Sequence, residues 1–300
     1  MSSSPPHTYP QPYLSSGTSS TGLTFDASKI KLHKLVWEAP HVLRVSFDRK
    51  PVNSWIELMW RELAAIFAHI RTDANVNAVV LSGEGRCFTA GLDLSSSSLG
   101  AILDQETDVA RRAWRVRIWL RELQDALTMM EKCDRPIVGA VHDVAYGLAI
   151  DLLCCVDVRI AESKARFSIK EVDAGLAADV GTLQRFPKIV GNESAARELA
   201  LTGREFDAQE ALRIGFLSRV VEGGRDGVLA AAIAIAKDIA SKAPIAARGT
   251  KDLLLHARDH SVDDGLAYTA AWNAAMLQSE DIPVAMAAVL QKKKPTFEKL

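Results

Sequence analysis

Cysteine is scarce in this 300-residue chain, and neither sign of charge is in excess. The four cysteines, Cys87, Cys133, Cys154 and Cys155, form no CxxC pair, and the adjacent two lie in an apolar run, which favours packing roles in a reducing compartment. Lys and Arg number 36 against 37 Asp and Glu, a net charge of -1. This balance provides no general field to attract nucleic acid or an anionic membrane, so we expect neither as a partner.

Long uncharged hydrophobic runs are also missing. Charged residues interrupt every apolar stretch before it reaches the roughly 18 residues expected of a membrane helix. Gly83 and Gly85 lack the third glycine of a dinucleotide-binding fingerprint, and no GK[ST] occurs, which weakens the nucleotide-binding classes. The sequence therefore predicts a globular protein, whose 48% hydrophobic residues can fill a sizeable core.

Composition divides the chain into three parts. Residues 1–25 are rich in Ser, Thr, Pro and Gly and hold no Lys or Arg, so residues 1–28 are predicted to be a disordered leader. Residues 29–222 alternate strand and helix patterns, which indicates a largely parallel or mixed sheet. Residues 223–300 form alanine-rich helices with broad apolar faces, which predicts burial against the main domain or a second subunit.

The first half of the central part has a regular order of elements. A hairpin, a helix, a strand, a long helix and a buried strand are expected in turn over residues 31–47, 53–70, 78–82, 107–132 and 136–141. Asn53 or Ser54 is predicted to cap the first helix.

The first segment that could carry chemistry is SGEGRCFTAGLDL, residues 82–94. It joins a strand end to a turn of small residues, where Gly85 and Gly91 would let backbone N–H groups approach a ligand. Taken alone, this segment is better explained as a tight loop without a ligand.

The second segment, VHDVAYGLAIDLLCCVDVRIA (141–161), turns at Gly147 from a strand into a helix. The first N–H groups of a helix have no partner within it, so the N–H of Leu148 is free to bind an oxyanion, assisted by the helix dipole. Asp151, three residues later, projects from the same face. A carboxylate in an apolar helix is costly unless it is paired or used, although a charge that caps the helix start is the simpler role for Asp151.

Two other polar residues of this segment have structural explanations. Asp157, close to Arg159, is interpreted as half of an ion pair, and His142 as a histidine of the core or of a turn.

The third segment, FSIKEVDAGLAADVGTLQRFPKIVGN (167–192), places Glu171, Asp173 and Asp179 among small and apolar residues. Acids that converge in an apolar pocket can have raised or split proton affinities, as general acid–base chemistry requires. A solvated loop charge is the alternative for each acid, and it is the one adopted for Asp173.

Together the three segments resemble the enoyl-CoA hydratase/isomerase (crotonase) superfamily, and the third is similar to its dienoyl-CoA isomerase branch. The segment CFTAGLDL (87–94) corresponds to the first oxyanion loop and GLAIDL (147–152) to the second, and the likeness runs from about Lys31 to the end. It implies an α/β fold, a spiral of strand-strand-helix repeats with an all-helical C-terminal region. That region would build a homotrimer or homohexamer.

The resemblance also implies roles for the site residues. The thioester oxygen of a fatty-acyl-CoA would lie between the N–H groups of Leu92 and Leu148, where an enolate is stabilised. Superfamily hydratases use two glutamates, at the positions of Asp151 and Glu171, and have glycine in place of Asp179. This chain has the isomerase pattern, which implies conversion of 3,5-dienoyl-CoA to 2,4-dienoyl-CoA in fatty-acid β-oxidation, with Glu171 and Asp179 moving protons between C2 and C6 and Asp151 orienting or tuning them.

Other expectations follow from the same resemblance. The substrate-binding residues would be Ala90, Gly91, Leu92, Asp93, Leu94 and Gly147. No metal or separate cofactor is expected, because coenzyme A is part of the substrate. The second oxyanion loop has Leu148 and Ala149 where the family usually has glycines, which would narrow the acyl pocket. Arg49, Lys50 or the lysines at 292–294 could meet the CoA phosphates, although solvated surface charge explains them more simply.

Two rival functions remain open at this point. An enoyl-CoA hydratase is disfavoured by the aspartates at 151 and 179, and a noncatalytic acyl-CoA-binding or assembly member is disfavoured by the retained acids and oxyanion loops. The terminal residues Glu298-Lys299-Leu300 match the last two positions of the SKL peroxisomal signal, so a peroxisomal location is expected, with mitochondrial and cytoplasmic as alternatives.

Overall fold

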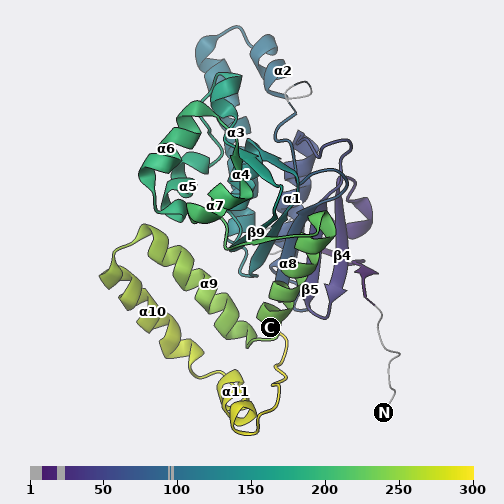
Figure 1. Ribbon diagram of the computed structural model, residues 1–300, viewed down its shortest axis with the longest axis vertical. Helices are drawn as coiled ribbons and strands as arrows, with labels where there is room; N and C mark the ends of the chain where they lie inside the picture. Colours follow the sequence, from purple (N-terminus) through teal and green to yellow (C-terminus); the bar gives the residue numbers. More distant parts are fainter. Residues whose placement is uncertain (1–8, 19–23, 94, 96–97) are drawn as a thin grey trace.

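A seven-stranded sheet forms the centre of the molecule (Figure 1). The computed structural model describes residues 9–18, 24–93, 95 and 98–300. The strands lie in the order β1 (Gln11–Pro12), β4 (His33–Ala39), β5 (Val42–Phe47), β6 (Ala78–Gly83), β7 (Ile137–Val141), β9 (Val158–Glu162) and β12 (Arg219–Val221). The first two pairings are antiparallel and the rest are parallel. This confirms the predicted hairpin and the mixed sheet.

Two smaller sheets complete the strands. A three-stranded sheet has the order β11 (Phe206–Asp207), β10 (Arg166–Ser168) and β8 (Val144–Tyr146), and β2 (Ser16–Thr18) pairs with β3 (Thr24–Asp26). Strand β8 follows β7 after two residues and runs straight into helix α4, so it carries the chain from the main sheet to the second predicted oxyanion loop.

The helices include those predicted over 53–70 and 107–132, after Gly147 and beyond residue 222, together with four, within residues 98–105 and 182–213, that were not predicted. The helices are α1 (Glu57–Ile70), α2 (Ser98–Gln105), α3 (Val109–Glu131), α4 (Leu148–Cys154), α5 (Thr182–Val190), α6 (Glu193–Thr202), α7 (Ala208–Arg213), α8 (Gly224–Ala240), α9 (Pro244–Asp259), α10 (Val262–Met276) and α11 (Asp281–Leu290), with short 3-10 turns η1 (Ala27–Lys29) and η2 (Glu171–Ala174). The long helix α3 begins after Asp108, whose carboxylate accepts the N–H of Arg111 at 2.8 Å and so satisfies a free helix-start donor.

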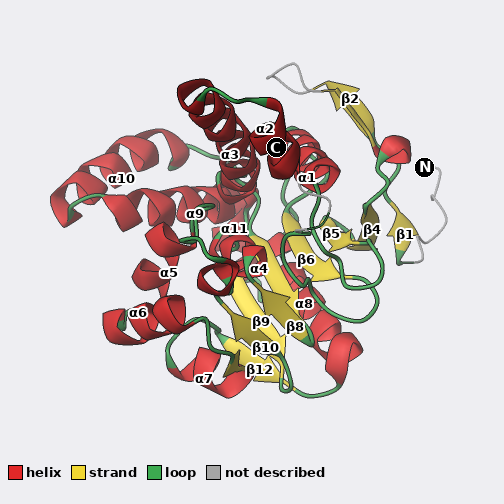
Figure 2. Cartoon of the chain, turned by 90° about the horizontal axis from the view of Figure 1, so that it is seen from above, coloured by secondary structure: helices red, strands yellow, loops and turns green. Residues whose placement is uncertain are grey.

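Helices cover both faces of the main sheet (Figure 2). One face meets α1, α3 and α4 in the larger apolar core, and the other meets α8, whose Val228, Ala232 and Ala236 pack on Val80 and Val138. Because both faces are covered, every residue of β5, β6 and β7 is buried, as is typical of parallel strands.

The C-terminal helices pack in two different ways. Helix α8 packs on the sheet, whereas α9 and α10 lie side by side and project from the body of the molecule, followed by α11 (Figure 1). Trp272 of α10 lies against Gly249 of α9, where a Cβ would come within 2.7 Å of the indole. The outer faces of these helices carry exposed apolar side chains, among them Leu266 and Val289.

The N-terminal segment differs from the prediction of a disordered leader. Residues 1–8 and 19–23 lie outside the described residues, but Gln11–Pro12 form the edge strand β1 beside β4. Tyr13 and Phe25 are buried, and the Phe25 ring stacks on His69 with centroids 4.4 Å apart. Two aromatic side chains thus anchor a segment whose overall composition is typical of disorder.

Two local predictions were wrong. Helix α1 begins at Glu57 after Ile56, and Asn53 has φ of 52°, whereas an N-cap residue is usually extended. Asp157 does not bridge to Arg159; its carboxylate accepts the N–H of Ile137 at 2.7 Å and pairs with Lys251 at 2.9 Å. The sequence gives no local sign of Lys251, because this partner lies 94 positions away.

Candidate functional site

A mostly apolar cavity of ≈ 320 Å³ lies where the loop after β6, the start of α4 and the segment around η2 meet. Helices α2 and α3 contribute to its wall. Its apolar lining includes Leu99, Leu103, Trp119, Leu123, Leu148 and Leu176. The same cavity is lined by all three predicted acids and by most of the predicted binding residues, Ala90, Gly91, Leu92, Gly147, Asp151, Glu171 and Asp179. The fold thus brings together three segments that are far apart in sequence.

The first predicted oxyanion loop is held along its length by the segment before α1. The N–H of Ala90 donates to Val52 O at 3.0 Å, the N–H of Trp55 donates to Gly91 O at 2.8 Å, and the N–H of Asp93 donates to Trp55 O at 2.8 Å. Between these bonds the N–H of Leu92 has no acceptor within the described residues. It remains free to bind a ligand atom.

Glycine is required at residue 91 for two reasons. Its φ of 92° is in the left-handed region, and a Cβ there would lie 2.7 Å from the Tyr146 carbonyl oxygen. The same Cβ position is 3.7 Å from the backbone nitrogen of Leu148. The close approach that glycine allows therefore brings the first loop against the start of α4.

The second predicted oxyanion loop begins at Gly147, the residue before α4. Its N–H donates to Ser168 O at 2.9 Å, and its φ is 56°. The next N–H, that of Leu148, is the first of the helix and has no acceptor among the residues that the structure describes. Two residues with unused N–H groups, one from each loop, thus line one cavity.

Asp151 is buried on the first turn of α4. Its Oδ1 accepts the N–H of Thr182, at the start of α5, at 2.6 Å. Burial, followed by the nearby charge of Glu171, raises the pKa of Asp151 to about 7. The carboxyl group therefore joins two helices and also titrates close to neutral pH.

Glu171 stands on η2, after β10. Its Oε1 lies 3.5 Å from the position of a Cβ on Gly147, and its buried Oε2 has no hydrogen-bond partner in the described chain. Burial raises its pKa, and the charge of Asp179 raises it further. A buried carboxyl oxygen without a protein partner is costly for stability, which favours a role toward a ligand.

Asp179 lies in the loop between η2 and α5. Its backbone oxygen accepts a 2.6 Å hydrogen bond from Gln124 of α3, and burial raises its pKa. Asp179 also borders a second, polar cavity of ≈ 570 Å³, lined by Lys132, Arg185 and other charged residues. Asp179 is exposed as a whole residue and lies at the boundary between an apolar and a polar space.

A buried ion-pair cluster supports the loop that carries Asp179. Arg185 of α5 donates to both carboxylate oxygens of Glu131, the last residue of α3, at 2.9 and 3.0 Å, and Arg258 of α9 donates to one of them. Burial alone would raise the pKa of Glu131, but hydrogen bonds from the two guanidinium groups outweigh it and lower the pKa. Arg185 follows Gly181 by one helical turn, so this cluster fixes the end of the acid-bearing segment.

Some predicted residues do not line the cavity. Asp93 forms an ion pair with Arg49 at 2.8 Å. Arg49, one of the residues expected to meet a CoA phosphate, is therefore already paired with a carboxylate. Leu94 lies outside the described residues. Lys50 and the lysines at 292–294 are exposed, and Asp173 pairs with Lys170 at the surface. His142 is buried in a turn with its Nε2 3.2 Å from Gly85 O, as predicted.

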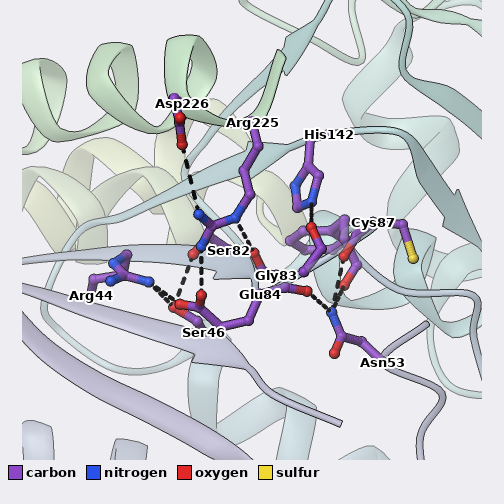
Figure 3. A network of polar contacts seen from close by, with 12 residues as sticks. Arg44, Ser46, Asn53, Ser82, Gly83, Glu84, Cys87, His142, Arg225 and Asp226 are labelled. Carbon is purple, nitrogen blue, oxygen red and sulfur yellow. Dashed lines mark hydrogen bonds and ion pairs between the residues drawn. The ribbon is translucent and has the colours of Figure 1, made fainter. Parts of the chain in front are cut away.

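A polar network beside the first oxyanion loop was missed in the sequence (Figure 3). The carboxylate of Glu84 is held by Arg44 of β5 and, at 2.7 Å, by Arg225 of α8, and Arg225 also donates to Gly83 O at 3.1 Å. Asn53 faces the same turn with its side-chain amide, as Figure 3 shows. No sequence motif signals these contacts, because they join residues up to 142 positions apart.

Three further observations concern metal binding, membrane helices and the cysteines. Among the residues that the structure describes, no cluster of three or more His, Cys, Asp or Glu could hold a metal ion. No helix over the same residues is both long and apolar enough to cross a membrane. The four cysteines are buried as free thiols, in agreement with their predicted packing role.

Comparison with known proteins places this geometry in a family. Residues 38–299 match the family model described as "Enoyl-CoA hydratase/isomerase". A mitochondrial Δ(3,5)-Δ(2,4)-dienoyl-CoA isomerase of Rattus norvegicus is 44% identical over 264 residues, 87% of this chain and 80% of that protein. A peroxisomal protein of the same name from Arabidopsis thaliana is 40% identical over 240 residues, 80% of this chain and 86% of its own.

Solved structures agree with the fold. An enoyl-CoA hydratase from Bacillus anthracis superposes with a TM-score of 0.80 at 27% sequence identity, and the match covers 89% of this chain and 99% of that one. The cavity, the two free N–H groups and these likenesses lead to one conclusion: the chain belongs to the enoyl-CoA hydratase/isomerase family and has the crotonase fold.

Proposed function

We propose that this protein is a dienoyl-CoA isomerase that converts 3,5-dienoyl-CoA to 2,4-dienoyl-CoA in fatty-acid β-oxidation. The observation that carries the proposal is the convergence of Asp151, Glu171 and Asp179 on one apolar cavity. The relatives at 40% and 44% identity bear this name, whereas the hydratase with a solved structure is 27% identical.

The reaction begins with the thioester carbonyl between two backbone donors. The N–H groups of Leu92 and Leu148 bind the carbonyl oxygen, and they bind it more strongly as charge develops on it. One carboxylate then removes a proton from C2, and the electron pair spreads through the conjugated system to the thioester oxygen. Addition of a proton at C6 gives the 2,4-diene, without any net change in oxidation state.

Glu171 and Asp179 act as the proton shuttle. C2 and C6 lie four bonds apart, and a carboxyl group must come within about 3 Å of the proton it moves, so two acids at different places are needed. Both have raised pKa values, because burial disfavours their charged forms. Two such carboxyl groups readily share a single proton. In the resting enzyme one of them is then a carboxylate base and the other a protonated acid.

Asp151 orients and tunes this pair. Its negative charge would raise the proton affinity of its neighbours, and its own bond to the Thr182 N–H keeps the start of α5 beside α4. No metal or separate cofactor takes part in the proposed steps. The cavity's apolar wall, with Trp119 and Leu123, receives the acyl chain, and Ala90, Gly91 and Gly147 line the thioester end.

The first test offers the purified protein a 3,5-dienoyl-CoA and, separately, a 2-enoyl-CoA. The proposal predicts growth of the absorbance of a diene conjugated with the thioester, with little loss of the 2-enoyl thioester. Hydration alone would make the protein an enoyl-CoA hydratase. Binding of acyl-CoA without turnover of either compound would favour a noncatalytic binding or assembly role.

A homotrimer or homohexamer is the proposed assembly. Leu266, Val289 and Leu290 are more than half exposed on α10 and α11, a pattern that favours a further contact surface on the C-terminal helices. Light scattering coupled to gel filtration should give three or six times the 32.6 kDa chain mass. A monomer at micromolar concentration would contradict the proposal.

A peroxisomal location is proposed, with a mitochondrial one as the alternative. The names of the two relatives divide in the same way, mitochondrial in the rat and peroxisomal in Arabidopsis thaliana. Leu300 is partly exposed, while the Lys299 ammonium donates to Asn75 at 2.7 Å. Imaging of the full chain with and without residues 298–300 tests the peroxisomal proposal, which requires that the deletion abolish import.

A further inference from the structure

We propose that Asn53 is a positioning residue of the oxyanion hole: its side chain and backbone set the place of the Leu92 N–H. This inference rests on the proposed function, because it gives that N–H the role of an oxyanion donor. Asn53 lies outside the cavity and is 3% exposed. It would act on the reaction only through the loop from Thr89 to Leu92.

The Asn53 side chain closes the turn that precedes this loop. Its Nδ2 donates to Glu84 O at 2.9 Å, to Cys87 O at 2.9 Å and to Phe88 O at 3.2 Å (Figure 3). Two amide hydrogens serve three carbonyl oxygens, so one hydrogen is shared. Its Oδ1 accepts the N–H of Arg49 at 3.0 Å, which also fixes the amide orientation.

The Asn53 backbone is connected by hydrogen bonds to the loop that carries Leu92. Its carbonyl oxygen accepts the hydroxyl of Thr89 at 2.6 Å, and the same hydroxyl accepts the N–H of Gly91 at 3.1 Å. Asn53 has φ of 52°, a conformation that asparagine adopts more readily than most residues. A chain of hydrogen bonds thus runs from Asn53 to the residue before Leu92.

The position of the Leu92 N–H depends on how firmly the preceding turn is held. The loop contains no helix or strand, and Asn53 donates to three carbonyl groups that precede it. The bonds to Cys87 O and Phe88 O are buried, so these oxygens would be costly to leave without a donor. An oxyanion donor works only at about 3 Å from the developing charge, and a displacement of about 1 Å can lower the rate about 100-fold. Loss of the Asn53 amide should therefore lower kcat more than it weakens substrate binding.

The first test compares Asn53→Ala and Asn53→Asp with the wild-type enzyme, in the 3,5-dienoyl-CoA assay and in thermal unfolding. Asn53→Ala should lower kcat by about 30- to 100-fold and change KM less than about threefold. In Asn53→Asp a carboxylate faces three carbonyl oxygens at pH 8. Protonation restores one donor, so kcat relative to wild type should rise at least fivefold between pH 8 and pH 6.

The surroundings allow this pH test to be interpreted. The charged and titratable groups near residue 53 include Arg49 with Asp93, Glu84 with Arg44 and Arg225, His142, and Cys87, whose thiol donates to Val52 O. They are present in both enzymes, and the ratio to wild type at each pH removes their titration and that of the three acids. Asn53→Ala should show no comparable rise.

A second pair of variants keeps the proposal testable if both Asn53 variants fail to fold. Thr89→Ser keeps the bridging hydroxyl, whereas Thr89→Val removes it at nearly the same volume. The kcat of the serine variant should therefore be at least tenfold higher than that of the valine variant. Glu62→Gln is the matched control for general damage. Glu62 is buried, accepts the N–H groups of Lys31 and Leu32, contacts His33 and does not line the cavity, so this change should lower the unfolding temperature and leave kcat within about twofold.

Several outcomes would overturn the inference. A folded Asn53→Ala enzyme with kcat within threefold of wild type would do so, as would a loss confined to KM or equal kcat in the two Thr89 variants. Absence of isomerase activity in the wild-type protein is a different result, because it would remove the proposed function rather than the role of Asn53.

Discussion

The backbone N–H of Thr182 donates to the carboxylate of Asp151 at 2.6 Å, although the two residues are 31 positions apart. This bond connects the first turn of α5 to the first turn of α4. Asp151 therefore both links two helices and lines the cavity. A substitution that keeps the hydrogen-bond acceptor but removes the charge separates its effect on stability from its effect on the reaction.

Replacement of Asp151 by Asn should make stability less dependent on pH. Burial raises the pKa of Asp151 from 3.8 to about 7, so between these values the folded protein binds one more proton than the unfolded chain. The free energy of unfolding of the wild type therefore falls as pH rises through this window. Asn keeps an acceptor for Thr182 and carries no charge, so the variant should be the more stable protein at pH 8, by at most about 4 kcal/mol.

Urea unfolding of Asp151→Asn and wild type at pH 5 and pH 8 checks this. Asp238→Asn, an exposed acid in α8, serves as the control and should show no such pH dependence. A stability difference that is equal at both pH values would contradict the expected titration of Asp151.

Asp179→Asn should abolish most of the isomerase activity and leave the fold intact. The amide cannot give or take the transferred proton, and loss of a general acid or base typically lowers the rate by about 10²- to 10⁴-fold. Acyl-CoA binding by calorimetry and the unfolding temperature should change little, because the bond to Gln124 uses the Asp179 backbone. Unchanged turnover would remove Asp179 from the proton shuttle.

Leu148→Pro should lower kcat by removal of one N–H group. Proline is tolerated at the first position of a helix, where its missing N–H has no partner in the helix. Loss of one oxyanion donor lowers kcat by about 10²- to 10³-fold. Leu148→Ala removes the buried side chain but keeps the N–H, and the comparison of the two kcat values isolates the backbone donor. Equal kcat for the two variants would count against an oxyanion role for Leu148.

Glu131→Gln should destabilise the protein at neutral pH by about 3 to 5 kcal/mol, because Arg185 and Arg258 would be left with a neutral partner in a buried position. The pKa of Glu131 is lowered, so its stabilising effect is present above its unfolded-state pKa and is lost as pH falls through the folded value. The difference between variant and wild type should therefore shrink in acid.

Denaturant unfolding at pH 7 and pH 4 measures this effect. Glu193→Gln breaks an exposed pair with Arg197 four residues along α6 and is the matched control, with an expected change below about 1 kcal/mol. A loss for Glu131→Gln as small as that of the control would show that the buried cluster contributes little.

The sequence predicted the order of elements because apolar periodicity is a local property. The strands β4 to β7, the helix α3 and the change to helices beyond residue 222 were all identified in this way. Asp151, Glu171 and Asp179 were noticed because acids are unusual among apolar residues. Their shared cavity depends on packing between α4, η2 and the following loop, and only the family resemblance anticipated it.

The errors come from interactions that join distant residues. Asn53 was interpreted as a helix cap because asparagine favours both caps and left-handed conformations. Its three carbonyl partners lie more than 30 positions away, as does the Lys251 partner of Asp157. Tyr13 and Phe25 are buried against the fold although serine, proline and glycine surround them in sequence. Local composition cannot reveal these contacts.

The Glu131 cluster limits which C-terminal helices this chain could accept from a relative. Arg258 belongs to the C-terminal helices, yet its guanidinium neutralises a carboxylate that also holds the segment bearing Asp179. A chimera that took α9 from a relative without an equivalent of Arg258 would leave Glu131 with one cation in a buried place. Residue 222 therefore marks a change in composition, whereas Glu131, Arg185 and Arg258 form one charged unit that spans it.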